Sequence, residues 1–403
     1  MAPKRVLIFC LAYYPRFIGG DGVAIKEITD RIDPEDIEFH MITLRFDSTL
    51  PRVEKIGNVL VHRIGYSRPN SSMSDLKKFP LHYTKAIFQI SAAFKAFVLH
   101  RKYKYNATWA IMAHSAGVPA ALFKIFQPKV PFVLTLQEGD PPEHIEKVMK
   151  PFWFLFARAF TSADMVQVIS TFLGKWARKR GYKGPLEVVP NAVNTKHFSQ
   201  TYPESELAAL KEKLGKKEGD VFLITTSRLV HKNALDDVIR ALPMLPTNVH
   251  FVILGIGPDE VMLKKLAKDL GVVNRVQFVG LIEHKEMPKF LHVCDIFIRP
   301  SRSEGMGNSF VEAMAAGVPI VATQEGGIAD FLFDATRDPE KVTTGWAVDP
   351  DAPEQIAAQV REIMSNQGVV SKVVDQARAL AFEKYDWETV VRDMREKVFK
   401  KVL

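Results

Sequence analysis

The fold is decided by the stretch Ser303-Glu304-Gly305-Met306-Gly307-Asn308-Ser309-Phe310-Val311-Glu312-Ala313-Met314-Ala315-Ala316-Gly317-Val318-Pro319, a glycine-rich loop that leads into an apolar helix. Glycine lets the loop backbone come close to a ligand, because it tolerates conformations that a side chain forbids. Asn308 or Ser309 can cap the helix, and Ser309-x-x-Glu312 is typical of a capping box. Since a helix N-terminus carries unpaired N–H groups and partial positive charge, we expect an electron-rich ligand here.

Each acid of this stretch has a simpler explanation when it is taken alone. Glu312 is then a capping-box glutamate, and Glu304 is an ordinary loop acid. Their combination with a Gly-x-Gly loop and a following turn into the apolar run 317–323 favours a ligand site. With a Glu, seven residues and a second Glu, the chain resembles the retaining glycosyltransferases of family 4, whose two-Rossmann architecture is called GT-B.

The resemblance implies an α/β protein with two Rossmann-like domains, whose parallel sheets face a central cleft. Residues 1–195 would form the N-terminal acceptor domain, and the C-terminal helix over residues 385–403 would cross back to pack on it. Residues 196–384 would form the nucleotide-sugar donor domain. The length of 403 residues agrees with two domains, because single hydrophobic cores usually stop growing at roughly 250–300 residues.

Two cations lie just beyond a predicted strand of the second half. Arg228 and Lys232 follow the apolar run 221–227, where the planar Arg fork and the Lys point charge are suited to a diphosphate. In the resembling family this pair binds the donor diphosphate, and its charge would stabilise the leaving group without a metal or another cofactor. The resemblance assigns the ribose hydroxyls to Glu312 and the sugar hydroxyls to Glu304. The predicted donor-binding residues are Gly19, Gly20, Arg228, Lys232, Ile282, Glu304, Gly305, Met306, Gly307, Asn308, Ser309 and Glu312.

The first half supplies the remaining candidates. Gly19 and Gly20 lie between the first predicted strand, Arg5–Cys10, and a helical pattern, where backbone N–H groups can receive phosphate. His114 follows a second predicted strand, at the kind of position where open α/β sheets bind ligands. The resemblance implies that this histidine faces the donor sugar. We therefore predict His114, Glu304, Arg228 and Lys232 as the catalytic residues.

Two acids of the first half, Glu138 and Asp140, follow another apolar run. They could contact an acceptor hydroxyl, but the simpler interpretation makes both of them surface loop acids.

Charge is distributed unevenly along the chain. Residues 1–195 carry 27 Lys and Arg against 16 Asp and Glu, whereas the remainder carries 27 against 30. The basic half could face anionic lipid, a phosphorylated acceptor or nucleic acid, or it could be a solvated basic surface. Nucleic acid is suggested by charge alone, so we do not predict it as a partner.

A basic, aromatic segment over residues 77–105 leaves two interpretations open. Its apolar and basic residues alternate in the manner of a basic amphipathic helix, which can lie on an anionic membrane surface. Alternatively, the helix packs its aromatic side against the sheet of its own domain.

Other features favour a cytoplasmic protein with, at most, peripheral membrane contact. No apolar run reaches the roughly 18–20 residues that a spanning helix needs. The apolar stretch near Met1 continues without a small-residue cleavage site. Cys10 and Cys294 lie in apolar contexts, as expected of reduced core cysteines.

The predicted activity is transfer of a sugar from a nucleoside-diphosphate sugar to an acceptor hydroxyl, with retention at the anomeric carbon. UDP is the favoured nucleotide and GDP the second; the acceptor is a glycan, a glycolipid or another hydroxyl compound of cell-surface polysaccharide or glycolipid synthesis. Alternatives are an epimerase or hydrolase of nucleoside-diphosphate sugars with the same fold, or a non-catalytic partner subunit. A non-catalytic subunit should have lost the glutamate pair or the cations, and this chain has lost neither.

Overall fold

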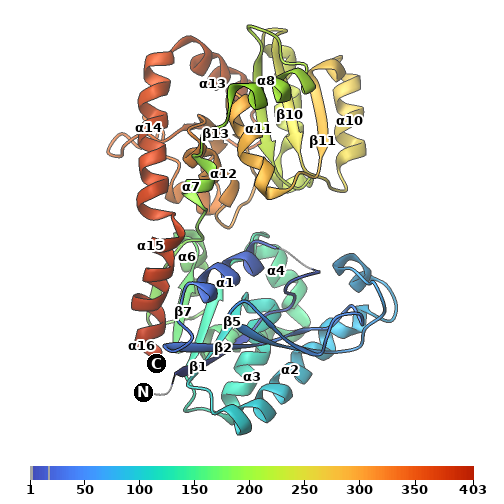
Figure 1. Ribbon diagram of the computed structural model, residues 1–403, viewed down its shortest axis with the longest axis vertical. Helices are drawn as coiled ribbons and strands as arrows, with labels where there is room; N and C mark the ends of the chain where they lie inside the picture. The colour runs from blue at the N-terminus through green and yellow to red at the C-terminus, as the bar shows by residue number, and fades with distance from the viewer. Residues whose placement is uncertain (1–2, 17–18) are drawn as a thin grey trace. The chain divides into compact units, whose positions relative to one another are not determined.

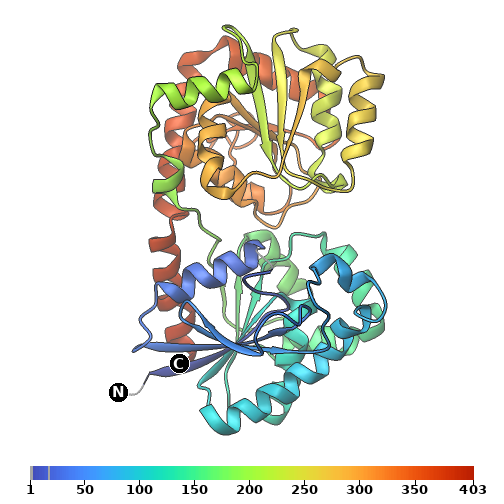
Figure 2. The same cartoon turned by 45° about the vertical axis from the view of Figure 1, so that its right-hand side comes forward.

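The computed structural model describes residues 3–16 and 19–403, which form two compact units (Figure 1). Unit 1 comprises Met1–Asn191 and Trp387–Leu403, and unit 2 comprises Ala192–Asp386. Unit 2 therefore includes residues 192–195 and 385–386, which the sequence analysis assigned to the first domain. Each unit has a sheet covered by helices on both faces, as the turned view shows (Figure 2).

The sheet of unit 1 has the strand order β3-β4-β2-β1-β5-β6-β7-β8. Neighbouring strands run parallel except β3 and β4. The strands are β1 Lys4–Phe9, β2 Ile37–Leu44, β3 Val53–Ile56, β4 Val59–Ile64, β5 Ala107–Ile111, β6 Phe132–Leu136, β7 Met165–Val168 and β8 Leu186–Val188. Val6 to Phe9 are fully buried, as the continuous apolar pattern of a strand covered on both faces requires.

The helices of unit 1 include the C-terminal segment of the chain. They are α1 Gly20–Asp30, α2 His82–Tyr103, α3 Val118–Phe126, α4 Pro142–Met149, α5 Trp153–Thr161, α6 Thr171–Lys179, α15 Trp387–Asp393 and α16 Lys400–Val402. The Phe399 ring lies 5.9 Å from the ring of Phe39 and 5.2 Å from that of Trp109, centroid to centroid. The last residues thus complete the core of unit 1.

The sheet of unit 2 is entirely parallel, with the order β11-β10-β9-β12-β13-β14. Its strands are β9 Val221–Thr226, β10 Val249–Leu254, β11 Val276–Gly280, β12 Ile296–Arg299, β13 Ile320–Thr323 and β14 Trp346–Val348. Its helices are α7 Thr195–Phe198, α8 Glu204–Lys213, α9 Leu235–Ala241, α10 Glu260–Asp269, α11 Met287–Val293, α12 Asn308–Ala316, α13 Pro353–Ser365 and α14 Gln367–Lys384.

The strand order creates one topological switch point in each sheet. In unit 1 the order reverses between β1 and β5, and in unit 2 between β9 and β12. Ligands of open α/β sheets bind outside the carboxyl ends of the strands at such points, because the connections leave in opposite directions and open a crevice. The loops after these four strands contain most of the predicted site residues.

Candidate functional site

A pocket of about 330 Å³ lies at the switch point of unit 2. It brings together five of the predicted donor residues: Arg228, Ile282, Asn308, Ser309 and Glu312. The other lining residues are Thr226, Ser227, Leu254, Gly255, Ile256, Leu281 and Met287. Residues far apart in the sequence meet here because they follow the carboxyl ends of neighbouring parallel strands.

The pocket is lined by both apolar and polar side chains. Leu254, Ile256, Leu281, Ile282 and Met287 supply aliphatic and thioether side chains. The polar lining includes the Arg228 guanidinium, the Ser309 hydroxyl and the Glu312 carboxylate, the last two from the first turns of α12. Such a site suits a ligand with a flat apolar ring joined to hydroxyl and anionic groups.

The predicted capping box at the start of α12 is wrong. The helix begins at Asn308, its cap is Gly307 with φ +90°, and no side chain caps it. Ser309 is therefore the second helical residue, and Glu312 is too far along the helix to reach a capping N–H group. An ideal Cβ at position 307 would lie 2.5 Å from the ring of Phe310, so glycine alone fits this turn. The two side chains remain available for other contacts.

Arg299, at the end of β12, makes one of these contacts. Its Nη1 donates to Ser309 Oγ at 2.8 Å, and its Nη2 donates to Glu304 Oε2 at 3.1 Å. The guanidinium carbon also lies 4.2 Å from the ring centroid of Phe310. Burial lowers the pKa of the Arg299 guanidinium, and the carboxylates of Glu304 and Glu312 oppose that shift. Arg299 thus holds the two predicted donor groups Glu304 and Ser309 in fixed positions.

The Glu304 loop is also fixed through its backbone. Gly327 N donates to Glu304 O at 3.0 Å, and Gly326 has φ +63°. An ideal Cβ at position 326 would lie 2.0 Å from Glu304 O, so a side chain there would displace the loop. Met306, another predicted donor residue, is buried at 2% exposure. Its side chain therefore cannot reach a ligand, and only its backbone can make a contact.

Lys232 lies beside the same loop, in a short 3-10 helix over His231–Asn233. Arg302 N donates to Lys232 O at 2.7 Å, and Arg302 Nη1 donates to His231 O at 2.8 Å. Asn233 Nδ2 donates to Arg228 O at 2.7 Å. These bonds tie the backbones of both predicted phosphate cations to one another and to the Glu304 loop. The side chains of Lys232 and Glu304 do not line the 330 Å³ pocket.

His114 lies at the switch point of unit 1, just after β5. The preceding Met112 has φ +71°, an uncommon conformation for a residue with a side chain. The His114 side chain is about one-third exposed, and its Nδ1 lies 3.6 Å from Glu138 Oε1. Glu138 is buried and accepts from Ala113 N at 2.6 Å. The prediction that Glu138 is a surface acid is therefore wrong, because the strained turn places it beneath His114; Asp140 is exposed as expected.

Gly19 and Gly20 lie at the same switch point, after β1. Gly20 begins α1, and Gly19 precedes it in an extended conformation without a capping side chain. An ideal Cβ at position 20 would meet no atom within 4 Å. The start of α1 therefore offers accessible N–H groups, as the prediction of a phosphate contact requires.

Two residues of these sites were missed by the sequence analysis: Arg299 and His284. His284 Nε2 donates to Glu312 Oε1 at 3.1 Å from the loop that follows Ile282. Arg299 had a usable signal, since it is a charged residue at the end of a buried strand. His284 had none, because only the tertiary structure shows what it contacts. Glu138 was named as a possible acceptor contact, but the sequence did not show that it is buried beside His114.

Among residues 3–16 and 19–403 there is no group of three or more His, Cys, Asp or Glu side chains that could hold a metal ion.

Two protein families match most of the chain. The family described as Glycosyltransferase Family 4 matches residues 18–197, and Glycosyl transferases group 1 matches residues 208–380. An uncharacterized glycosyltransferase of Methanocaldococcus jannaschii is 25% identical over 402 residues, which cover 96% of each protein.

Two further proteins illustrate the range of relatives. A GDP-mannose-dependent alpha-(1-6)-phosphatidylinositol monomannoside mannosyltransferase of Mycolicibacterium smegmatis is 30% identical over 243 residues, which are 58% of this chain and 61% of that protein. Among solved structures, Anabaena HepE in complex with UDP and glucose has a TM-score of 0.74 at 19% identity, covering 98% of this chain and 100% of that one.

Proposed function

Because the chain belongs to glycosyltransferase family 4, with the GT-B fold, we propose that it transfers a hexose from a nucleoside-diphosphate sugar to an acceptor hydroxyl with retention at the anomeric carbon. The observation that carries this proposal is the 330 Å³ pocket, which brings apolar side chains together with Arg228, Ser309 and Glu312 at a helix N-terminus. A base, a ribose and a phosphate need apolar, acceptor and cationic groups, and the lining supplies all three.

Each part of the donor has a partner in unit 2. The base would lie against Leu281 and Ile282, and the ribose hydroxyls would donate to Glu312. The diphosphate would bind Arg228 and Lys232, whose backbones are held together by Asn233 and Arg302. Glu304, oriented by Arg299, would accept from hydroxyls of the sugar.

The proposed transfer is a same-face reaction. The bond between the anomeric carbon and the phosphate oxygen breaks, while the acceptor oxygen bonds to that carbon on the same face. The departing phosphate oxygen takes the acceptor proton. Arg228 and Lys232 stabilise the developing negative charge electrostatically, so we expect turnover without a divalent metal.

Donor binding is the first test. UDP is our first choice of nucleotide and GDP the second; HepE was solved with UDP, and the mycobacterial relative uses GDP-mannose. A nucleotide at 100 times its dissociation constant should add about 2.7 kcal/mol to the free energy of unfolding. The rise in melting temperature with UDP, GDP, ADP and their sugar conjugates reports this stabilisation. The variant Glu312→Ala should lose the rise. If no nucleotide raises the melting temperature, the donor proposal fails.

Retention is tested on the product. With the donor that stabilises the protein and a panel of glycan and glycolipid acceptors, the anomeric ¹H coupling constant of the product should match that of the donor. Turnover should persist in EDTA. An inverted product contradicts the mechanism, and release of free sugar in place of transfer indicates a hydrolase.

We further propose that the enzyme acts in the cytoplasm, in surface polysaccharide or glycolipid synthesis, and that α2 docks on anionic membrane. In the described part of the chain, no helix is both long enough and apolar enough to cross a bilayer. The buried side of α2 consists of Thr84, Phe88, Ala92, Ala93, Ala96 and Leu99.

Helix α2 packs on the sheet through its buried side, which includes the aromatic residue Phe88, but other large apolar side chains of the segment face away from it. Phe79, Ile90 and Phe94 are 70–74% exposed. The exposed Lys77 and Lys78 precede the helix, and Lys85 follows one turn into it. Apolar and basic groups on one exposed segment match the interface of an anionic bilayer.

Sedimentation with phosphatidylglycerol vesicles tests the membrane proposal. The protein should pellet with them at low salt, and neutralising Lys77, Lys78 and Lys85 to Gln should reduce the bound fraction. The matched control neutralises Lys211, Lys213 and Lys217 of unit 2. Equal binding by both triple variants, or no pelleting of the wild-type protein, contradicts the proposal.

A further inference from the structure

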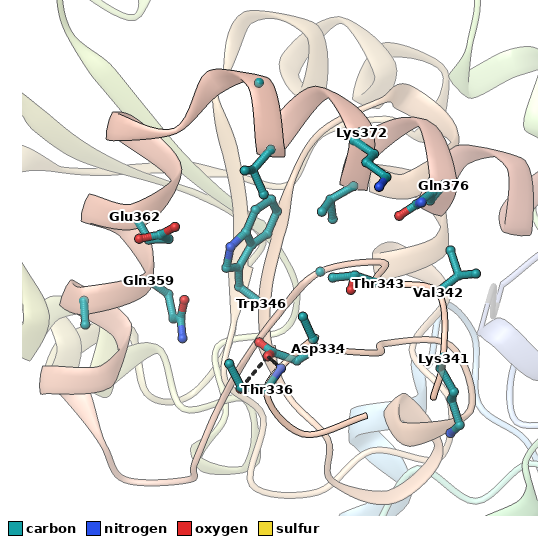
Figure 3. Close-up of a pocket in the computed structure, with 16 residues that line it drawn as sticks. Asp334, Thr336, Lys341, Val342, Thr343, Trp346, Gln359, Glu362, Lys372 and Gln376 are labelled. Atoms are coloured by element: carbon teal, nitrogen blue, oxygen red, sulfur yellow. Dashed lines mark hydrogen bonds between the residues drawn. The ribbon is translucent and has the colours of Figure 1, made fainter. Parts of the chain in front are cut away.

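A groove of about 920 Å³ lies in unit 2, and it shares no lining residue with the donor pocket (Figure 3). Helices α13 and α14 form two of its walls, and the loop over residues 334–345 with β14 forms the rest. The volume falls in the range of roughly 300–1,000 Å³ that is usual for small-molecule sites. Nothing in the donor chemistry uses this groove.

The groove lies at the free edge of the sheet, but it is not a site for an added strand. Asp334 is buried, and its Oδ2 accepts from Ala347 N of the edge strand β14 at 2.7 Å. Thr344 N also donates to Phe333 O at 2.8 Å. Because Asp334 already occupies the outward-facing N–H group of Ala347 in this three-residue strand, β14 offers little edge for an added strand. The occupant must be recognised by side chains.

Several polar side chains facing the groove have unused hydrogen-bonding capacity. Gln359 of α13 and Gln376 of α14 are half-buried, and neither side chain has a hydrogen-bond partner among the described residues. Lys372 likewise has no hydrogen bond or ion pair within the described part of the chain, whereas Lys341 pairs with Asp338. In Figure 3, Gln359 and Glu362 lie on one side of Trp346, and Lys372 and Gln376 lie on the other.

Apolar surface is interleaved with these polar groups. Val342 of the loop and Val369 of α14 are 60% and 53% exposed, and the mostly buried Trp346 lies between Glu362 and Lys372 (Figure 3). Primary amides donate and accept hydrogen bonds at once, which matches hydroxyl groups, since these also do both. The groove carries both a positive charge, on Lys372, and a negative charge, on Glu362, so it does not favour an anionic ligand. A pyranose ring, with an apolar C–H face and a rim of hydroxyls, has the complementary chemistry.

We propose that this groove is a second, non-catalytic saccharide site that binds a neutral oligosaccharide. The choice of a glycan over another neutral amphiphile rests on the proposed function. The existence of the groove, and of the Gln359 and Gln376 amides without a partner among the described residues, does not depend on that function. A glycan held there would stay bound to the enzyme between transfers.

Saturation-transfer NMR and isothermal titration with maltotetraose, cellotetraose and α-1,6-mannotetraose test the proposal on the full-length protein. At least one of these probes should bind, and Gln376→Ala with Lys372→Ala should weaken it about five- to tenfold, the loss expected for one or two hydrogen bonds. Lys384→Ala, the same change on an exposed part of α14 outside the groove, should leave the affinity unchanged. Transfer to a short acceptor should also be unchanged in the double groove variant and in Lys384→Ala.

A donor-site variant separates this inference from the proposed function. Glu312→Ala should abolish nucleotide binding and keep saccharide binding, if the groove is the second site. Loss of saccharide binding in Glu312→Ala, full binding in the double groove variant, or no binding of any of the three probes at 10 mM would overturn the inference. A protein that binds saccharide in the groove yet transfers no sugar would refute the enzyme proposal alone.

Discussion

Removal of the Arg299 guanidinium should both destabilise unit 2 and disable the proposed donor site. This side chain is 5% exposed and donates to Ser309 Oγ, Glu304 Oε2 and Thr226 O at 2.8, 3.1 and 3.3 Å. Arg299→Met fills a similar volume but removes the charge and all three bonds. The Glu304 side chain, 14% exposed, then keeps its negative charge without the buried cation that orients it.

The size of both effects follows from that geometry. Breaking a buried ion pair by removing one partner costs about 3–5 kcal/mol of stability, because an uncompensated charge is left behind. A catalytic group displaced by about 1 Å can cost on the order of 10²-fold in rate. Arg299→Lys should lie between the wild-type protein and Arg299→Met, since it keeps the charge and loses the planar fork.

Urea denaturation and the rate of nucleoside diphosphate release measure the two effects. Arg240→Met is the matched control, because Arg240 is exposed on α9; it should change the unfolding free energy by no more than about 0.5 kcal/mol. A double-mutant cycle with Glu304→Gln isolates the pair, since the loss on removing Arg299 should shrink when Glu304 is neutral. If the loss is the same in both backgrounds, or if Arg299→Met has wild-type turnover, Arg299 does not act through Glu304.

Three other predictions can be checked with the same protein. Lys232→Ala should cost several kcal/mol in transition-state stabilisation at unchanged melting temperature, and wild-type turnover would remove this cation from the mechanism. Gly326→Ala should raise the dissociation constant for the donor and lower stability by about 1–3 kcal/mol, because its Cβ would meet Glu304 O; unchanged titration curves would show that the loop adapts. Burial lowers the pKa of His62 to about 4, so the folded state binds fewer protons than the unfolded state below pH 6.5. Its unfolding free energy should therefore fall from pH 6.5 to 4, by up to ~1.4 kcal/mol per pH unit; His62→Leu should flatten that dependence, and His144→Leu, at an exposed position, should not.

The sequence predicted the parts of the fold that local patterns encode. Buried parallel strands appear as short apolar runs, and β1 differs by one residue at each end from the predicted Arg5–Cys10. Predicted residues such as Arg228, Ile282 and Glu312 meet in one pocket, because consecutive strand ends share one edge of a sheet. The assignment to family 4 is confirmed by the two family matches.

The prediction of a capping box was wrong because a tertiary contact shifts the start of the helix. A Ser-x-x-Glu pattern predicts a cap only if the helix starts at the serine. Here Gly307 fits beneath the Phe310 ring in a left-handed conformation, so the helix starts one residue after that glycine. Similarly, residues 77–105 allowed a core helix or a membrane helix, and only the structure shows that Phe79 and Phe94 face outward.

The sequence by itself therefore determined the class of the protein, the order of its strands and helices along the chain, and five of the twelve residues that line the 330 Å³ pocket. These features depend on the spacing of apolar residues and on which residues follow a strand, and both can be read from short stretches of sequence. The tertiary structure alone decided which side chains orient them: Arg299 beneath Glu304, Glu138 beneath His114 and His284 beside Glu312. Such pairs depend on how separate strands and loops come together in the folded unit, and only packing sets those distances.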